Sequence, residues 1–282
     1  MQFITLERDI LTFCFITKRL NMRKLFILGV ALTISVAMLM TSCKKEEVNN
    51  DNNQDHVLPN AVIDIDGNHY DAVQIGDQIW MAENLRTTKY ADGTKIPMGS
   101  TSHTEPYRYA PGDGYSNEEN MGYVARYGYL YNWPAVMHGA SSSGANPSGV
   151  QGICPNGWHV PSDAEWTQLT DYMKTQTIYM ASSNADHLAK ALAATWGWYS
   201  SSETDAPGNN PSTNNASGFS ALPAGLYDRS DSRCFGSQTF FWCATESSDG
   251  SAYVRWLLND IANVERFSQR KDLGFSVRCV RD

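Results

Sequence analysis

The side chains that could do chemistry in this sequence are its cysteines and histidines and one group of aromatic and amide residues. Four histidines lie far apart in the sequence and show no pattern with a serine or cysteine partner: His69, His103, His138 and His187. Catalytic triads are assembled in space, so the pattern does not exclude one, but no residue indicates it. His159, beside Trp158, is expected to be packed and hydrogen-bonded rather than a base. We therefore predict neither an enzyme nor a cofactor site.

A candidate ligand site lies between residues 196 and 215. Trp196, Trp198 and Tyr199 precede a long polar loop, and aromatic faces can stack on sugar rings. The loop side chains that could bind sugar hydroxyls are Asp205, Asn209, Asn210, Asn214 and Asn215. The alternative, which a single sequence favours, places the aromatic residues in the core and the loop residues in solvated turns.

No metal site is predicted. Asp205, Asn209 and Asn210 carry oxygen ligands of the kind that calcium takes, but no acidic cluster accompanies them. Zinc would require closely spaced cysteine or histidine pairs, and the sequence has none.

Residues 1–42 are predicted to hold an upstream extension and a lipoprotein signal peptide, with Met22 as the true start. Two basic residues follow Met22, and residues 25–40 form an apolar run that is shorter than the about 20 residues of a membrane span. Small residues directly precede Cys43, which resembles the lipobox of bacterial lipoproteins, in which the cysteine is lipid-modified and becomes the first residue. A plain secretory signal or a helical anchor would explain the apolar run but not the cysteine, so we predict a lipid anchor on Cys43.

Residues 43–60 are predicted to form a flexible polar tether, because they have too little apolar content to fold. Two lysines and two glutamates directly after Cys43 resemble the surface-export signal of Bacteroidetes lipoproteins. A generic solvated linker explains the composition equally well. The expected location is the outer membrane or cell surface, with the membrane as a partner through the lipid on Cys43.

The composition of the whole chain predicts a folded domain after the tether. Hydrophobic residues make up 42% and charged residues 18%, which is typical of a packed core. The net charge of −8 argues against nucleic acid as a partner, because phosphate binding needs clustered lysine and arginine. Eight tryptophans and fourteen tyrosines indicate an aromatic-rich β or α+β protein.

The cysteines predict disulfides, because an even number in an exported chain is typical of them. After the two cysteines of the N-terminal region, four remain: Cys154, Cys234, Cys243 and Cys279. Four cysteines allow three pairings. Cys234 and Cys243 flank a predicted turn and suit a local link, which leaves Cys154 with Cys279. A Cys154–Cys279 disulfide would close a loop of on the order of 100 residues, which contributes about 4–5 kcal/mol to the free energy of unfolding in the chain-entropy model.

Apolar spacing and turn residues predict the elements that position these groups. Residues 69–82 are predicted to form a β-hairpin with a turn at Gly76, and residues 127–133 an aromatic strand. Ser162 and Glu165 fit a capping box, which predicts a helix over 163–175. A second helix is predicted from residue 183 or 184 to the Trp196 region.

Further strands are predicted at 219–225, 239–245, 252–258, 263–267 and 275–280. Strands first, helices in the middle and strands last predict an α+β fold, as one domain over residues 61–282.

Six motifs together resemble the Fibrobacter succinogenes major paralogous domain family. They lie at 73–85, 131–133, 152–162, 217–225, 241–246 and 274–280. The resemblance covers residues 62–282. Members of this family occur in exported bacterial proteins, often lipoproteins, which agrees with the lipid anchor predicted above.

A more distant resemblance implies an architecture. Cys154 before Gly-Trp, the helix opening at Pro161 and the Gly-Phe-x-x-Arg segment that ends at Arg278 resemble C-type-lectin-like folds and their sulfatase-modifying-factor branch. The resemblance implies two helices packed on antiparallel strands with long loops. It also implies a disulfide from the first helix region to the last strand, in agreement with Cys154–Cys279.

The sequence departs from the active members of that group. The calcium tripeptide of sugar-binding C-type lectins is absent, and the active cysteine pair of the formylglycine-generating enzymes is not matched at Cys234 or Cys243. We therefore predict a surface-anchored, extracytoplasmic, non-catalytic binding module, with polysaccharide or an envelope protein as its partner. The second hypothesis is a structural or assembly component of the envelope without a small ligand, and the third is an enzyme of unknown type.

Overall fold

A computed structural model describes residues 57–112, 121–229 and 231–282. The signal peptide, the lipidation residue Cys43 and most of the predicted tether lie outside the described residues. Within them, no helix is long and apolar enough to cross a membrane.

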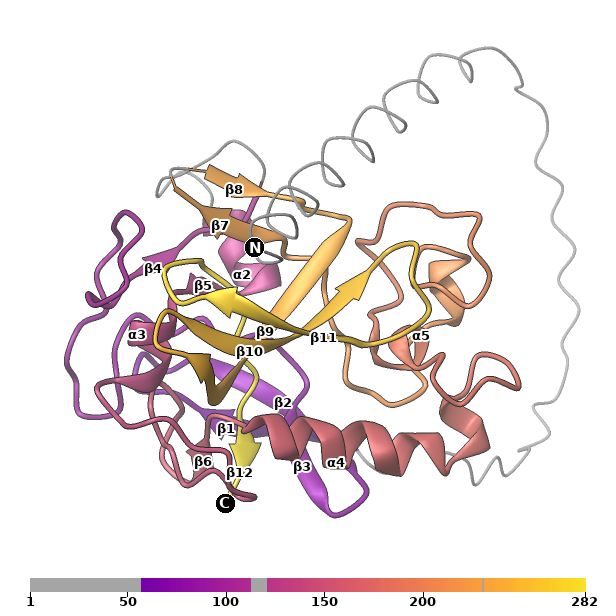
Figure 1. Cartoon of the computed structure of the whole chain (residues 1–282), viewed down its shortest axis with the longest axis horizontal. Coiled ribbons are helices and arrows are strands. Elements are labelled where there is room, and N and C mark those ends of the chain that lie inside the picture. Colours follow the sequence, from indigo (N-terminus) through magenta and orange to yellow (C-terminus); the bar gives the residue numbers. More distant parts are fainter. Residues whose placement is uncertain (1–56, 113–120, 230) are drawn as a thin grey trace, which may run out of the picture. The chain divides into compact units, whose positions relative to one another are not determined.

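Antiparallel sheets and short helices make up the described domain, so the predicted α+β class is confirmed (Figure 1). The largest sheet has the order β1-β2-β3-β12-β6. Its strands are β1 (Val57–Ile63), β2 (His69–Ile75), β3 (Gln78–Met81), β12 (Val280–Arg281) and β6 (Trp158–His159). The second sheet has the order β11-β10-β9, with β9 (Gln238–Ser248), β10 (Ser251–Leu258) and β11 (Glu265–Arg270). Two short pairs complete the strands: β4 (Arg108–Tyr109) with β5 (Leu130–Tyr131), and β7 (Leu226–Asp228) with β8 (Asp231–Arg233).

The helices are short apart from one. They are α2 (Met121–Tyr127), α3 (Trp133–Met137), α4 (Asp163–Lys174) and α5 (Ala189–Leu192), with 3-10 turns at η2 (Thr177–Tyr179) and η3 (Pro211–Thr213). The predicted helix at 163–175 is confirmed as α4, and Ser162 and Glu165 form the predicted capping box. The predicted hairpin is confirmed as β2–β3, with Gly76 at φ +61° in its turn.

The core forms where α4 packs between the two sheets. This helix contacts β2 of the large sheet and β9 and β10 of the smaller one. Its Trp166 is fully buried and touches Trp80, Phe219 and Phe241, with ring centroids 4.6, 5.7 and 5.5 Å away. Large aromatic side chains from four separate segments therefore share one cluster, which fixes α4 relative to both sheets.

Four predicted elements are shorter than the sequence indicates. The predicted strands at 219–225 and 275–280 are reduced to isolated bridges, apart from Val280 in β12. The other two are a helix and a strand. The predicted second long helix is wrong: only Ala189–Leu192 are helical, because Ala193 turns to extended backbone and pairs with Ala221. The Ala194 N–H donates to the Ala221 carbonyl. Residues 193–194 therefore form a β-bridge with Ala221 and do not continue the helix. The predicted strand at 127–133 keeps only Leu130–Tyr131, because Asn132 caps α3.

Arg278 lies fully buried next to the last strand. Its guanidinium donates to Asn84 Oδ1 at 2.7 Å and to the carbonyls of Met81 at 2.9 Å, Phe219 at 2.6 Å and Ser220 at 3.0 Å. Burial lowers the pKa of Arg278, yet four acceptors surround the cation in place of water. This side chain therefore joins the C-terminal segment to the end of β3 and to the loop at residues 219–220.

Replacing Arg278 by lysine is expected to lower the free energy of unfolding by at least about 3 kcal/mol, because an ammonium cannot reproduce the fork of hydrogen bonds. Urea unfolding followed by tryptophan fluorescence measures the change. The matched control is Arg281→Lys on β12, an exposed position that should change stability by less than about 0.5 kcal/mol. Equal stability of the two variants would contradict a central role for Arg278.

Candidate functional site

A groove of about 330 Å³ opens beside Trp196. Its lining comes from segments far apart in the sequence and includes Asp71, Glu83, Arg126, Trp196, Asn215 and Ser220. It therefore combines an aromatic face with a cation, two carboxylates, an amide and a hydroxyl. Two of these residues, Trp196 and Asn215, belong to the ligand set predicted from the sequence.

The Trp-Gly-Trp segment places one tryptophan at the surface and the other in the core. Gly197 has φ +89°, a conformation that favours glycine, and the chain bends there. Trp196 stays 45% exposed at the groove, whereas Trp198 is 6% exposed and donates its indole N–H to the Ala221 carbonyl at 3.2 Å. Trp198 is thus part of the core, which agrees with the alternative prediction that the aromatic residues of this segment are buried.

Trp196 is positioned by two neighbours from α2. Tyr127 meets its ring edge-on at a centroid distance of 5.6 Å. The Arg126 guanidinium lies 5.8 Å from the Trp196 ring centroid, within the range of a cation–π contact. The indole is therefore held in place while much of its surface remains in solvent.

One wall of the groove is a hydrogen-bonded loop. The Asn215 side chain donates to Ser220 Oγ at 2.8 Å and accepts from the Ser220 backbone N–H at 2.7 Å. Both residues have positive φ angles, 71° and 56°. The Ser220 carbonyl in turn accepts from buried Arg278, so this wall is tied to the interior of the domain.

Two carboxylates, those of Asp71 and Glu83, also line the groove. Glu83 Oε1 accepts from the Asp71 backbone N–H at 3.0 Å, and Glu83 Oε2 pairs with Arg86 at 3.0 Å. Asp71 Oδ1 accepts from the Asn60 backbone N–H at 2.9 Å. These bonds fix Asp71 on β2 and Glu83 just after β3, where both can accept hydrogen bonds from a ligand that carries hydroxyl groups.

The other residues of the predicted ligand set have separate places. Asn214 is buried and donates to the carbonyls of Ala194 at 2.9 Å and Pro207 at 3.0 Å. The backbone carbonyls of Asn209 and Asn210 accept from the Lys190 ammonium. Tyr199 is partly exposed and lies against Gly236. The structure therefore does not gather the predicted amides into one site.

Asp205 takes part in a cluster around His187 that only superficially resembles a catalytic triad. Ser182 Oγ lies 3.1 Å from His187 Nδ1, and Asp205 Oδ2 lies 2.9 Å from the same nitrogen. A triad needs the hydroxyl and the carboxylate on opposite ring nitrogens. This arrangement therefore cannot pass a proton from serine to histidine in the triad manner.

His159 is held between two carboxylates. Its Nε2 lies 2.6 Å from Glu165 Oε1, and its Nδ1 lies 2.7 Å from Asp282 Oδ1. Burial alone would lower the pKa of His159, but the two carboxylates outweigh it and raise the pKa above the ordinary value. Both ring nitrogens are occupied and the ring is buried, which confirms the expected packed, hydrogen-bonded histidine.

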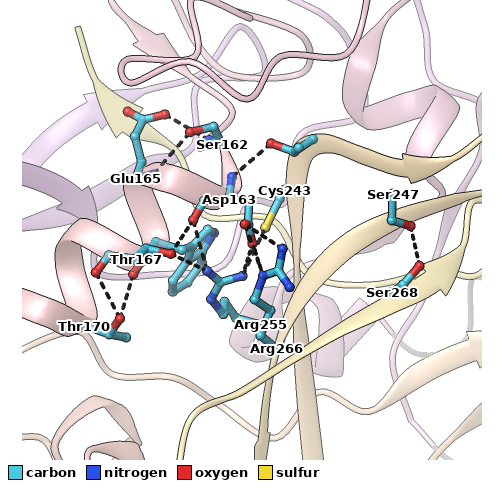
Figure 2. Close-up of polar contacts among 12 residues, drawn as sticks. Ser162, Asp163, Glu165, Thr167, Thr170, Cys243, Ser247, Arg255, Arg266 and Ser268 are labelled. Carbon is cyan, nitrogen blue, oxygen red and sulfur yellow. Dashed lines mark hydrogen bonds and ion pairs between the residues drawn. The ribbon is translucent and has the colours of Figure 1, made fainter.

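The N-terminus of α4 is also fixed to the second sheet (Figure 2). Asp163 pairs with Arg255 of β10 at 2.6 Å and with Arg266 of β11 at 2.8 Å. Burial would raise the pKa of Asp163, but the two guanidinium groups lower it overall. These polar contacts support the scaffold and do not line the groove.

One predicted disulfide is confirmed and one is wrong. Cys154 and Cys279 are bonded, with their Cα atoms 6.0 Å apart. The predicted local link between Cys234 and Cys243 does not form, because Cys243 is a free, buried thiol. Cys243 follows Gln238, the first residue of β9, by five residues. Because a strand rises about 3.3 Å per residue, Cys243 lies roughly 16 Å from the start of β9. The turn before β9, which contains Cys234, is therefore too far away for a disulfide.

No group of three or more histidine, cysteine, aspartate or glutamate side chains that could hold a metal ion occurs in the described part of the chain.

The domain is thus an α+β scaffold that carries a polar groove with an exposed tryptophan. The family model of the Fibrobacter succinogenes major domain matches residues 73–281. Because that match covers well over half of the chain, the protein belongs to this family. A comparison with curated proteins gave no match, and neither did a comparison with solved structures.

Sequence reasoning missed most of the groove. Asp71, Glu83 and Arg126 come from a strand, the segment after β3 and a helix, and no local pattern connects them. The Gly-Phe-x-x-Arg segment pointed to Arg278 only as part of a motif, not as the buried support of the groove wall.

The contact between His159 and Asp282 predicts a pH-dependent stability. A folded-state pKa above that of the unfolded histidine means that the interaction stabilises fully below about pH 6.5 and is lost as pH rises through the folded value. Asp282→Asn should therefore lower the free energy of unfolding by about 0.5–1 kcal/mol near pH 5.5 and by much less near pH 9. Urea unfolding over this range measures the difference, with exposed Asp77→Asn as control. A difference independent of pH would refute the interaction.

Cys243 is predicted to be unreactive in the folded protein. Burial raises the pKa of its thiol to about 12, so almost no thiolate forms at neutral pH. A thiol reagent such as dithionitrobenzoate should label Cys243 only after unfolding, and Cys243→Ser should remove that labelling. Rapid labelling of Cys243 in the native protein would contradict the buried placement.

Proposed function

We propose that this protein is a lipid-anchored, extracytoplasmic, non-catalytic binding module that holds a carbohydrate in the groove beside Trp196. The observation that carries the proposal is the placement of a largely exposed indole among charged and amide side chains. The apolar face of a sugar ring can stack on such an indole, while its hydroxyls bond to the surrounding acceptors and donors.

The sequence supports the anchor and the location in the proposal. Cys43 follows an apolar run and precedes a polar segment that leads to β1. A chain from Cys43 to Val57 can extend at most roughly 50 Å, which would let the domain stand off the membrane surface while still attached. The outer membrane or cell surface is therefore the proposed location.

A C-type-lectin-like architecture is part of the same proposal. It is supported by the disulfide between the segment before α4 and the segment before β12. It is also supported by α4 packed against antiparallel strands and by the long loops around the groove.

The non-catalytic assignment is supported by the two histidine clusters. Both ring nitrogens of His159 are already hydrogen-bonded to carboxylates. In the other cluster, the Ser182 hydroxyl and the Asp205 carboxylate both contact the same ring nitrogen of His187. The alternative function, a component of the envelope without a small ligand, predicts an intact protein that binds no glycan.

Trp196→Ala is expected to weaken carbohydrate binding at least tenfold with little change in stability, because nearly half of its surface faces solvent. Trp198→Ala should instead destabilise the domain by about 3–5 kcal/mol, because it empties a core position. A glycan array with the full chain in detergent, followed by calorimetry and urea unfolding of both variants, measures the two effects.

A second exposed aromatic residue, Tyr172→Ala on α4, serves as control and should leave binding unchanged. Absence of binding across plant, host and microbial glycans would overturn the carbohydrate proposal in favour of the envelope component.

A further inference from the structure

The aromatic surface does not end at the groove. Tyr123 of α2 is 41% exposed and contacts Tyr127, with ring centroids 6.1 Å apart. Phe235 meets both rings edge-on, at 5.1 Å from Tyr123 and 4.6 Å from Tyr127. Because Tyr127 also touches Trp196, four rings form one continuous aromatic strip: Trp196, Tyr127, Phe235 and Tyr123.

The geometry of α2 places a cation along this strip. Residues 123, 126 and 127 are spaced i, i+3 and i+4, so they share one face of the helix, while Val124 is buried. Arg126 is exposed and reaches the Trp196 ring. The helix therefore presents Tyr123 and Arg126 to solvent on the side that faces the groove.

Exposed apolar rings collect here more than elsewhere on the described surface. Only eight large hydrophobic side chains of the described residues are exposed, and Tyr123 and Trp196 are two of them. A third, Tyr199, packs on Gly236 next to Phe235. A cluster of exposed apolar side chains bordered by polar groups is typical of a binding surface.

We propose that the ligand is a polysaccharide chain bound along its length, over the groove and the aromatic strip, rather than a single sugar or a chain end. This proposal rests on the carbohydrate function proposed above and names the form of the ligand. Trp196 and Tyr123 are separate exposed platforms with Tyr127 between them, and one sugar ring covers about one aromatic face. A ligand that uses both must therefore contain several linked sugars.

The polar groups favour a sugar chain over a protein partner. The core of a protein–protein interface is apolar and depleted in aspartate, glutamate and lysine, and its polar groups lie at the rim. Here Arg126, Asp71 and Glu83 line the groove itself, next to the exposed indole. A polyhydroxylated chain can satisfy these groups at each ring, whereas an apolar protein surface would leave them unpaired.

The test compares the affinities of short and long oligosaccharides. Oligosaccharides of two and of six sugars, in β-1,4-glucan, β-1,3-glucan, β-1,4-xylan and α-1,4-glucan series, are titrated into the full chain by calorimetry. In the series that binds, the six-sugar ligand should bind at least tenfold more tightly than the two-sugar ligand. Tyr123→Ala should remove about tenfold of affinity for the long ligand and leave the short one unchanged, as expected for one stacking contact.

The variants separate the two proposals. Trp196→Ala should weaken both lengths, and Tyr172→Ala neither. If Trp196→Ala weakens binding while Tyr123→Ala does not, or if both lengths bind equally, the extended-chain proposal is overturned and the carbohydrate function stands. If no oligosaccharide binds the native protein, both proposals fail. Crosslinking of an envelope protein that depends on Tyr123 and Trp196, with no oligosaccharide bound, would assign the surface to a protein partner instead.

Discussion

The buried cation of Arg278 is the interaction on which the rest of the domain depends. An isolated charge in a protein interior is costly, and this one is accommodated because an amide oxygen and three backbone carbonyls accept its hydrogen bonds. Phe219 also lies under the guanidinium, with its centroid 4.6 Å away. The acceptors belong to segments distant in the sequence, so the arrangement exists only when all of them are in place together.

The disulfide and the sheet hold the same C-terminal segment by different means. Cys279 is bonded to Cys154, and Val280 pairs with Trp80 of β3 and His159 of β6. The last strand therefore lies between two strands that come from early and middle parts of the chain. Since Arg278 also bonds to Ser220, the position of the groove wall follows from the closure of this sheet.

Local interactions explain what could be predicted from the sequence. The β2–β3 hairpin and the capping box at Ser162 depend on contacts within a few residues, so their patterns are visible in the sequence. The second helix was overestimated because Ala193 and Ala194 pair with Ala221, a partner nearly thirty residues away. Most of the groove could not be predicted for the same reason, because its lining residues come from segments that are distant in the sequence. The free Cys243 shows that sequence spacing alone does not establish that two cysteines are close enough to bond.

The pair Trp196 and Trp198 shows why composition could not separate core from site. Both are tryptophans next to one glycine, yet the turn at Gly197 buries one and displays the other. The buried indole fixes the backbone that carries the exposed one, so the exposed ring is held before any ligand arrives. A preorganised ring loses little conformational entropy on binding, which favours affinity without a deep pocket.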